Sequence, residues 1–120
     1  MKNPVVWFEV VGKDGRKLQR FYSDLFGWKI EGAEGDPTYG LLAGVDSGIA
    51  GAVGQSQAET DGHVTVFIEV DDPAAYLDKA EKLGGRTIVP PTEVPSYNLT
   101  FAYFTDPQGH LIGLSKGMAR

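Results

Sequence analysis

The sequence predicts an α+β fold in which two tandem βαβββ modules form a pseudo-symmetric curved mixed sheet around a cleft. The first observation is a repeat: VVWFEV at residues 5–10 returns as TVFIEV at residues 65–70, an offset of 69 − 9 = 60 positions. The second is that each copy is followed by a polar break, an amphipathic helical pattern and then short β-rich segments. A unit of this length that occurs only twice indicates a pseudo-symmetric domain, and related strands on either side of a shared cleft form a natural ligand site.

The first module is expected at about residues 4–54. A strand is predicted at residues 5–10, because apolar and β-branched residues dominate there. The helix that follows is expected to end at Gly27, since glycine readily adopts the left-handed conformation of a helix terminus. Its apolar face has helical spacing and consists of Leu18, Phe21, Tyr22, Leu25 and Phe26.

The rest of the first module is predicted as three strands. Residues 28–30 open the first of these strands, and residues 32–37 form a loop. The other two, at residues 38–43 and 49–53, are joined by a turn at residues 46–48.

The second module is expected at about residues 63–116, after a polar linker at residues 55–62. Asp72 is predicted to cap its helix, with Pro73 in the first helical position. Residues 90–95, PPTEVP, are expected to be an irregular loop, because prolines at this density do not suit a central strand. The remaining strands are predicted at residues 63–70, 86–89, 99–105 and 111–115.

Composition restricts the classes of protein that are compatible with the chain. Its 120 residues suit a single domain, residues 1–120, and the net charge of −5 without a basic block argues against a nucleic-acid partner. No run of 18 apolar residues is present, so no membrane partner is expected. The chain has no cysteine, hence no disulfide and no thiolate metal site, and the N-terminus lacks an apolar signal stretch. Together these features favour a cytoplasmic protein.

Three motifs carry a resemblance to a known family. FYSDLFGW at residues 21–28, AEKLGG at residues 80–85 and FTDPQGHLI at residues 104–112 occur in order within the repeat. They resemble the signatures of the vicinal oxygen chelate superfamily, which contains glyoxalases, bleomycin resistance proteins and dioxygenases. The resemblance implies the paired βαβββ fold and one of several activities: isomerisation, epimerisation, ring-cleaving dioxygenation, thiol transfer to an antibiotic or sequestration of a drug. It also implies a homodimer, which the open sheet edges of a short chain favour independently.

The resemblance implies metal-ligand positions that this chain leaves without ligands. Metal-dependent members hold a divalent ion with His and Glu residues on the first and last strands of each module. Those positions fall on Trp7, Phe67, Gly113 and the strand at residues 48–53, which offer no donor atoms suited to such an ion. The sequence therefore predicts no metal and no cofactor, and neither glyoxalase I nor metal-dependent dioxygenase activity is expected.

Glu9 and Glu69 are the strongest candidates for a functional role. Side chains alternate along a strand, so Glu9 shares a face with Trp7, and Glu69 shares one with Phe67. A carboxylate on an apolar wall either pairs with a cation or has a raised pKa, which suits an acid, a base or an anchor for a basic or hydroxylated ligand. The alternative is a structural carboxylate that bonds backbone amides or meets an arginine such as Arg86.

The two histidines are weighed in the same way. His63 lies at the mouth of the second module's first strand, and His110 lies beside the turn at residues 106–109. Each suits a ligand or a general base near neutral pH, but a solvated loop position is the favoured interpretation, more strongly for His110 than for His63. The catalytic residue stays unknown, with Glu9, Glu69 and His63 as candidates.

The sequence thus predicts a metal-independent small-molecule binding protein with an aromatic cleft. The alternative is an enzyme of lyase, isomerase or dioxygenase type that acts on a small metabolite. Aromatic walls bind flat ligands by stacking and burial, although most aromatic residues of a domain belong to its core. Trp28, Tyr39 and Phe101 belong to this aromatic set. The predicted ligand-binding residues are Trp7, Glu9, Phe67, Glu69, Tyr97 and Tyr103.

Overall fold

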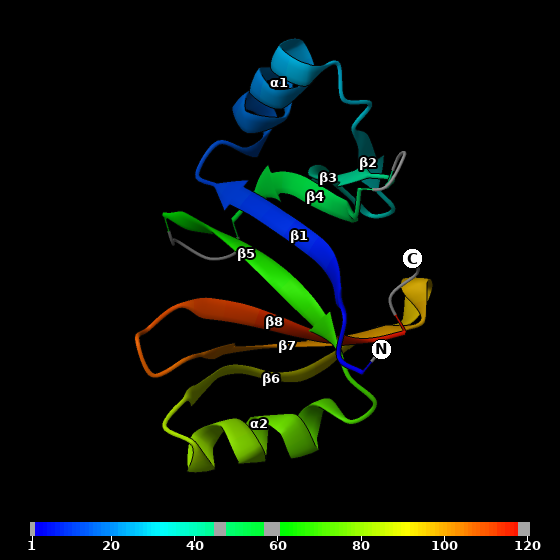
Figure 1. Cartoon of the computed structure of the whole chain (residues 1–120). Coiled ribbons are helices and arrows are strands. Elements are labelled where there is room, and N and C mark those ends of the chain that lie inside the picture. Colours follow the sequence, from blue (N-terminus) through cyan, green and yellow to red (C-terminus); the bar gives the residue numbers. More distant parts are fainter. Residues whose placement is uncertain (1, 45–47, 57–60, 118–120) are drawn as a thin grey trace. The chain divides into compact units, whose positions relative to one another are not determined.

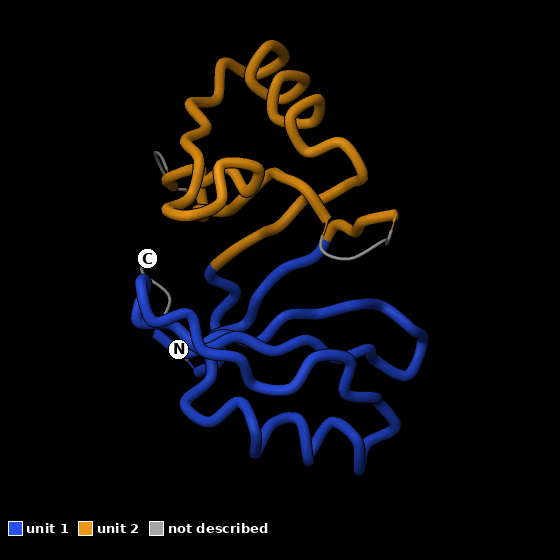
Figure 2. Tube along the Cα trace, turned by 180° about the vertical axis from the view of Figure 1, so that it is seen from behind, with its two compact units in different colours: residues 1–6, 65–119 blue, residues 7–64, 120 orange. Residues whose placement is uncertain are grey.

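The structure is a computed structural model that describes residues 2–44, 48–56 and 61–117 (Figure 1). The chain divides into two compact units (Figure 2). Unit 2 comprises residues 7–64, and unit 1 comprises residues 1–6 together with 65–119. Neither helix of the described chain has the length and apolar character that crossing a membrane requires.

Unit 2 contains the first β-α-β-β-β series. The elements are β1 (Val5–Gly12), α1 (Gly15–Phe26), β2 (Glu31–Ala33), β3 (Asp36–Leu42) and β4 (Ala50–Gln55). β1 runs parallel to β4, while β3 pairs antiparallel with both β4 and β2. The Asp14 side chain caps α1 by accepting a hydrogen bond from the N–H of Lys17, and Gly27 ends it at φ 70°.

Unit 1 contains the second series. Its elements are β5 (Gly62–Glu69, whose first residues group with unit 2), α2 (Pro73–Lys82), β6 (Arg86–Val94), the 3₁₀ turn η1 (Pro95–Tyr97), β7 (Leu99–Thr105) and β8 (Leu111–Lys116). β5 runs parallel to β8, and β7 pairs antiparallel with β8 and β6. This repeats the pairing of unit 2, so the predicted α+β fold of two βαβββ series in mixed sheets is confirmed.

The core of unit 1 lies between α2 and its sheet. Val70, Leu77, Ala102 and Leu114 are buried together, and Ile68, Tyr76 and Phe104 pack against them. The predicted helix start is confirmed, because the Asp72 carboxylate accepts the N–H of Ala75 at 3.2 Å and Pro73 is the first helical residue. α2 therefore lies on the face of the sheet to which the even-numbered residues of β5 point.

The predicted loop at residues 90–95 is wrong. β6 continues through Pro90 and Pro91 to Val94, and its pairing with β7 shifts between Thr87 and Val89 and again between Val89 and Thr92. β6 is the last strand in its sheet, so a proline whose nitrogen faces the open edge removes no hydrogen bond from a neighbouring strand. The bulges accommodate the prolines where β6 is irregular.

The strand predicted at residues 28–30 is also misplaced. β2 begins at Glu31, a turn with Gly35 at φ 82° follows it, and β3 starts at Asp36 within the predicted loop. Trp28 instead packs its ring against Phe8 and Tyr22, with centroids 5.9 and 5.7 Å away. The predicted turn at residues 46–48 and the predicted linker at 55–62 lie partly outside the described residues.

α1 is confirmed as a helix, but its apolar face is not buried. Phe21, Leu25 and Phe26 remain 56%, 58% and 57% exposed. Tyr22 stacks between this face and Trp28, which leaves three large apolar side chains on the surface of unit 2. Exposed apolar groups of this size that cluster on one helix are typical of interaction surfaces.

Candidate functional site

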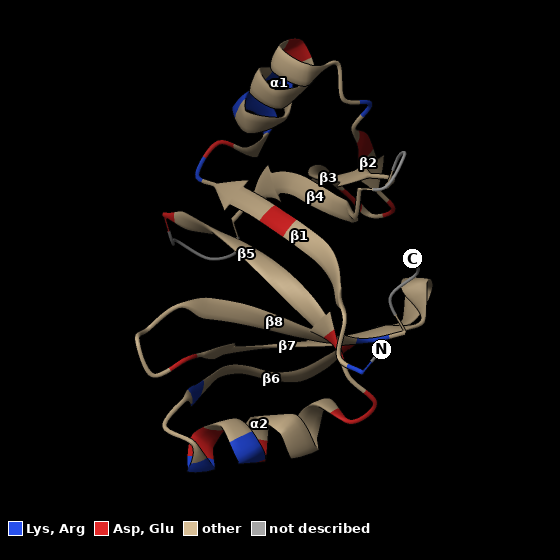
Figure 3. Ribbon diagram, viewed as in Figure 1, with Lys and Arg blue, Asp and Glu red and all other residues tan. Residues whose placement is uncertain are grey.

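The candidate site lies on one face of unit 2, around Glu9 in β1. The red segment within β1 in Figure 3 is Glu9, which is the only acidic residue of that strand. The residue is buried, with an exposed fraction of 4%. A buried carboxylate is costly unless it is paired or hydrogen-bonded, so its partners define the local chemistry.

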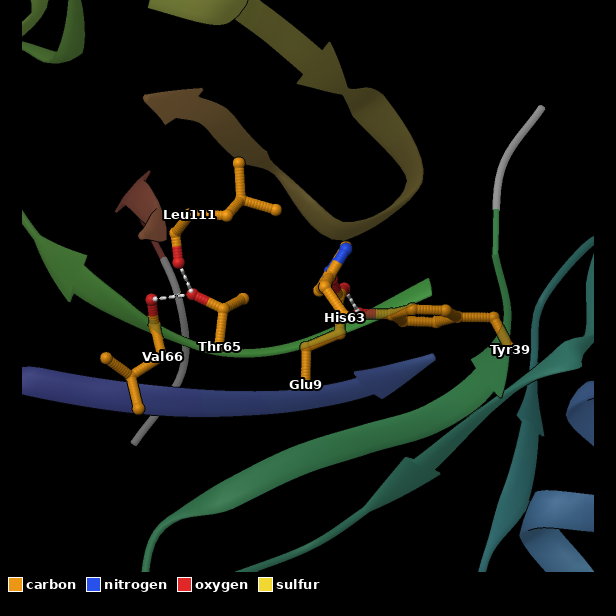
Figure 4. Close-up of polar contacts among 6 residues, drawn as sticks. All are labelled: Glu9, Tyr39, His63, Thr65, Val66 and Leu111. Atoms are coloured by element: carbon orange, nitrogen blue, oxygen red, sulfur yellow. Dashed lines mark hydrogen bonds and ion pairs between the residues drawn. The ribbon is translucent and has the colours of Figure 1, made fainter. Parts of the chain in front are cut away.

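Tyr39 of β3 is the first partner. Its hydroxyl donates a hydrogen bond to Glu9 Oε2 at 2.5 Å (Figure 4). The strand register explains the contact: Tyr39 pairs with Gly54 of β4, and Glu9 pairs with Ala52 two residues away. Gly54 and Ala52 carry little or no side chain, so the tyrosine ring reaches across β4 to the carboxylate.

His63 at the start of β5 is the second partner. Its Nε2 lies 2.5 Å from Glu9 Oε1, so the two carboxylate oxygens contact different residues (Figure 4). When the carboxylate is ionised it can only accept, so the ring N–H at Nε2 donates the hydrogen bond to Glu9 Oε1. The side chain of His63 is 25% exposed and that of Glu9 is 5% exposed, so His63 is the solvent-facing member of the pair.

Burial and charge together keep the Tyr39 hydroxyl protonated. Burial raises the pKa of Tyr39 well above its usual value of 10.0, and the negative charge of Glu9 raises it further. A hydrogen bond with the Trp7 side chain acts in the opposite direction. Trp7, Tyr39, Glu9 and His63 therefore form one connected group, which we call the Glu9 cluster.

The Glu9 cluster can support two kinds of chemistry. A carboxylate that holds one imidazole nitrogen fixes the orientation of the ring, as in general acid–base sites. The same arrangement presents a fixed polar group to a bound molecule, beside the aromatic rings of Trp7 and Tyr39. Tyr39 was predicted only as a candidate aromatic wall residue. The register of β3 against β4 reveals its polar role, and that register is not visible in the sequence.

The remaining predicted ligand-binding residues lie in unit 1. Phe67 packs its ring against Tyr103 at a centroid distance of 5.4 Å. Glu69 is half-buried and pairs in register with Ser115, while Tyr97 lies in η1 and is exposed. Phe67 and Glu69 share a face of β5, opposite the face that carries Ile68 against α2.

The strand pair β5–β8 in unit 1 is reinforced beside this face. The hydroxyl of Thr65 donates a hydrogen bond to the carbonyl of Leu111, as Figure 4 shows. Thr65 is buried, so the bond satisfies a hydroxyl that would otherwise lack water. The buried hydroxyl of Ser115 has no partner among the described residues.

His110 lies on an exposed turn of unit 1. Its ring Nδ1 is 3.1 Å from Asp106 Oδ2, while Asp106 Oδ1 accepts the backbone N–H groups of Gln108 and His110. The backbone N–H of His110 is the main cause that lowers the pKa of Asp106 below its usual value. These contacts fit a self-contained turn, which is the solvated-loop alternative.

At the positions where the resemblance implies metal ligands, the described side chains make other contacts. Trp7 interacts with Tyr39, and the Phe67 ring covers Gly113, where an added Cβ would lie only 2.4 Å from that ring. Within residues 2–44, 48–56 and 61–117, no three His, Asp or Glu side chains gather as a metal site would require. Our proposals therefore derive no step from a metal ion.

The fold and these motifs define a class of paired βαβββ proteins, and a comparison with protein-family models identifies the family. The model of the Glyoxalase/Bleomycin resistance protein/Dioxygenase superfamily matches residues 5–114. The chain belongs to this superfamily, as the resemblance predicted.

Among curated proteins, the chain is similar to the "Putative glyoxylase CFP32" of Mycobacterium tuberculosis, with 29% identity over 115 residues that cover 93% of this chain and 43% of the relative. It is also 28% identical to the "Anthracycline biosynthesis protein DnrV" of Streptomyces peucetius, over 86% of this chain and 43% of that protein. The chain thus spans less than half the length of these relatives.

Solved structures support the fold. The Mn(II)-bound glyoxalase from Novosphingobium aromaticivorans matches with a TM-score of 0.68 at 18% identity, over 96% of this chain and 38% of the other. A methylmalonyl-CoA epimerase from Streptomyces coelicolor, in complex with 2-nitronate-propionyl-CoA, matches with a TM-score of 0.64 at 14% identity, over 99% and 100% of the two chains. At these identities, the likeness concerns the fold alone.

Proposed function

We propose that this chain is a metal-independent small-molecule binding protein of the glyoxalase/bleomycin-resistance type, with its ligand held at the Glu9 cluster. The observation that carries the proposal is the bridging of a buried carboxylate between Tyr39 and His63, at 2.5 Å from each. Buried and fully partnered polar groups at one face of a sheet form a rigid site, because their orientation is fixed before a ligand arrives.

The geometry changes the role proposed for Glu9. We assign direct contact with the ligand to His63, because it is the more exposed residue of the pair. Glu9 is then a positioning residue that holds the imidazole ring in one orientation. Trp7 supplies apolar area beside the ring. Phe67, Glu69, Tyr97 and Tyr103 remain part of the proposed ligand-binding set.

A second candidate function is an isomerase or lyase that transfers a proton on a small metabolite. The short contact between Glu9 Oε1 and His63 Nε2 favours it, because a carboxylate-held imidazole is a common general base. In this version His63 is the catalytic residue, and Glu9 and Tyr39 position it. The relative named putative glyoxylase supports an enzymatic candidate at the level of the superfamily.

A thermal-shift screen of small metabolites and drugs, run in the presence of a metal chelator, tests the proposed function. We expect saturable stabilisation by at least one compound, reaching about 2.7 kcal/mol at a ligand concentration of 100 Kd. His63→Gln should abolish the shift, whereas His110→Gln, a matched change on an exposed turn, should preserve it. An equal loss of the thermal shift in His63→Gln and His110→Gln would contradict the proposal. So would a thermal shift that appears only with added divalent metal.

Product analysis separates the two candidate functions. Compounds that stabilise the protein are incubated with it and followed by NMR, in deuterated water to detect proton exchange. An unchanged compound supports binding. Exchange or conversion that disappears in His63→Gln supports the enzyme.

We further propose that the chain forms a homodimer and works in the cytoplasm. The exposed residues Phe21, Leu25 and Phe26 on α1 support self-association, because apolar side chains of this size gain by burial. The absence of cysteine is compatible with a reducing compartment. The acidic net charge of −5 supports the proposed absence of a nucleic-acid partner.

A further inference from the structure

Unit 1 contains a groove beside α2 that is separate from the proposed site. The groove has a volume of about 410 Å³, which lies within the range of small-molecule pockets. Its floor consists of Ile68, Val70, Phe104 and Leu114. Because side chains alternate along β5, Ile68 points away from the face that carries Phe67, so the groove is on the other side of the sheet.

The wall and rim of the groove differ in chemistry. Ala80 and Leu83 of α2 extend the apolar lining, and Leu83 is 70% exposed at its edge. Polar groups are confined to a few lining residues, among them Tyr76, Lys79 and Asp106. An apolar channel with sparse polar groups is typical of a site for an amphipathic molecule.

The two charges among these lining residues are not equivalent. The Asp106 carboxylate accepts the backbone N–H groups of Gln108 and His110 and contacts the His110 ring, all within its own turn. In the described part of the chain, the ammonium group of Lys79 has no ion-pair partner. Asp106 keeps its negative charge, but its oxygens are engaged within the turn, so Lys79 is the charged lining group that is left to pair with a ligand.

We propose that this groove binds an amphipathic carboxylate, with the apolar chain against the partly exposed Ile68, Phe104 and Ala80 and the carboxylate at Lys79. Burial of the chain supplies most of the affinity, because the lining is largely apolar. The exposed lysine contributes selectivity for an anionic head group, since an exposed ion pair adds little energy. The site is independent of the Glu9 cluster and uses no residue of unit 2.

Octanoate is the probe, and 1-octanol, which has the same chain without the charge, is the comparison compound. NMR titration of the full chain with octanoate should give saturable shifts at the amides of Val70, Ala80 and Leu114. Ala80→Phe should abolish these shifts, because the added ring fills the groove. Lys79→Gln should weaken octanoate by about threefold and leave octanol unchanged.

Lys82→Gln is the matched control, because it removes the same charge from the same helix at a position outside the groove. It should leave both titrations unchanged. Three results would overturn the proposal: octanoate shifts that do not saturate, octanoate binding that persists in Ala80→Phe, or equal effects of Lys79→Gln and Lys82→Gln. Groove amides that shift with protein concentration alone would overturn it in favour of a contact between copies. His63→Gln should not affect octanoate, so the two proposals fail separately.

Discussion

At the scale of single residues, the Glu9 cluster shows how a carboxylate can be kept inside an apolar face. Tyr39 and His63 occupy opposite oxygens, and Trp7 interacts with the Tyr39 hydroxyl. Each member depends on its neighbour for a hydrogen-bond partner, so a change at one position should affect the others.

Glu9→Gln keeps the shape of the side chain and removes its negative charge. We expect ligand affinity to fall by about 1.5–3 kcal/mol, the scale of the charged hydrogen bond between Glu9 and His63, because the imidazole that contacts the ligand is held less firmly, while the fold survives. Calorimetry with a ligand from the screen, alongside urea unfolding, checks this. Glu93→Gln, at an exposed position of β6, is the control and should change neither quantity. A sharp fall in stability with unchanged ligand affinity would make Glu9 purely structural.

Tyr39→Phe should alter stability at alkaline pH. The pKa of Tyr39 is raised in the folded protein by burial and by Glu9, so the folded state holds its proton more tightly than the unfolded state. The free energy of unfolding should therefore be insensitive to this group below the usual pKa of 10.0 and should fall as pH rises above it. Unfolding measured from pH 8 upward should show a shallower alkaline decline in Tyr39→Phe. If the free energy of unfolding declined equally with pH in Tyr39→Phe and in the original protein, ionisation of Tyr39 would not contribute to alkaline unfolding.

At the scale of elements, local rules predicted helices better than strands. Asp72 and Pro73 at the start of α2 and Gly27 after α1 are determined by nearby residues, so capping rules located them. β6 could not be read in the same way, because prolines are tolerated there only through its position at the edge of the sheet. That position depends on pairing between distant segments. The Tyr39–Glu9 contact is likewise set by the register of β3 against β4.

The prolines of β6 have a predicted protective role. The double change Pro90→Thr and Pro91→Thr gives the edge strand two more N–H donors without removing an apolar core residue. The variant should fold but self-associate through its edge, with scattering mass that rises with concentration. Pro107→Thr, in a turn, is the control and should behave like the original protein. A double variant with unchanged mass at all concentrations would show that the prolines do not protect this edge.

At the scale of the whole molecule, the sequence pattern of α1 predicted an apolar face correctly but did not indicate what covers it. Helical periodicity identifies which side chains share a face, whereas burial depends on the rest of the protein or on a partner. The curated relatives matched here are more than twice as long as the aligned region, since that region covers 43% of each. A second copy of the chain is our proposal for what covers this face.

The proposed homodimer leads to a specific expectation for Leu25. Light scattering at micromolar concentration should give about twice the chain mass of 12.9 kDa. Leu25→Lys places a charge within the exposed face formed with Phe21 and Phe26, so burial of that face against a second copy becomes costly and the mass should fall toward that of one chain. Leu83→Lys is the matched control, because Leu83 is also exposed and near the end of a helix, but in unit 1. A monomer mass for the original protein would reject the dimer, and equal dissociation by both changes would reject α1 as its interface.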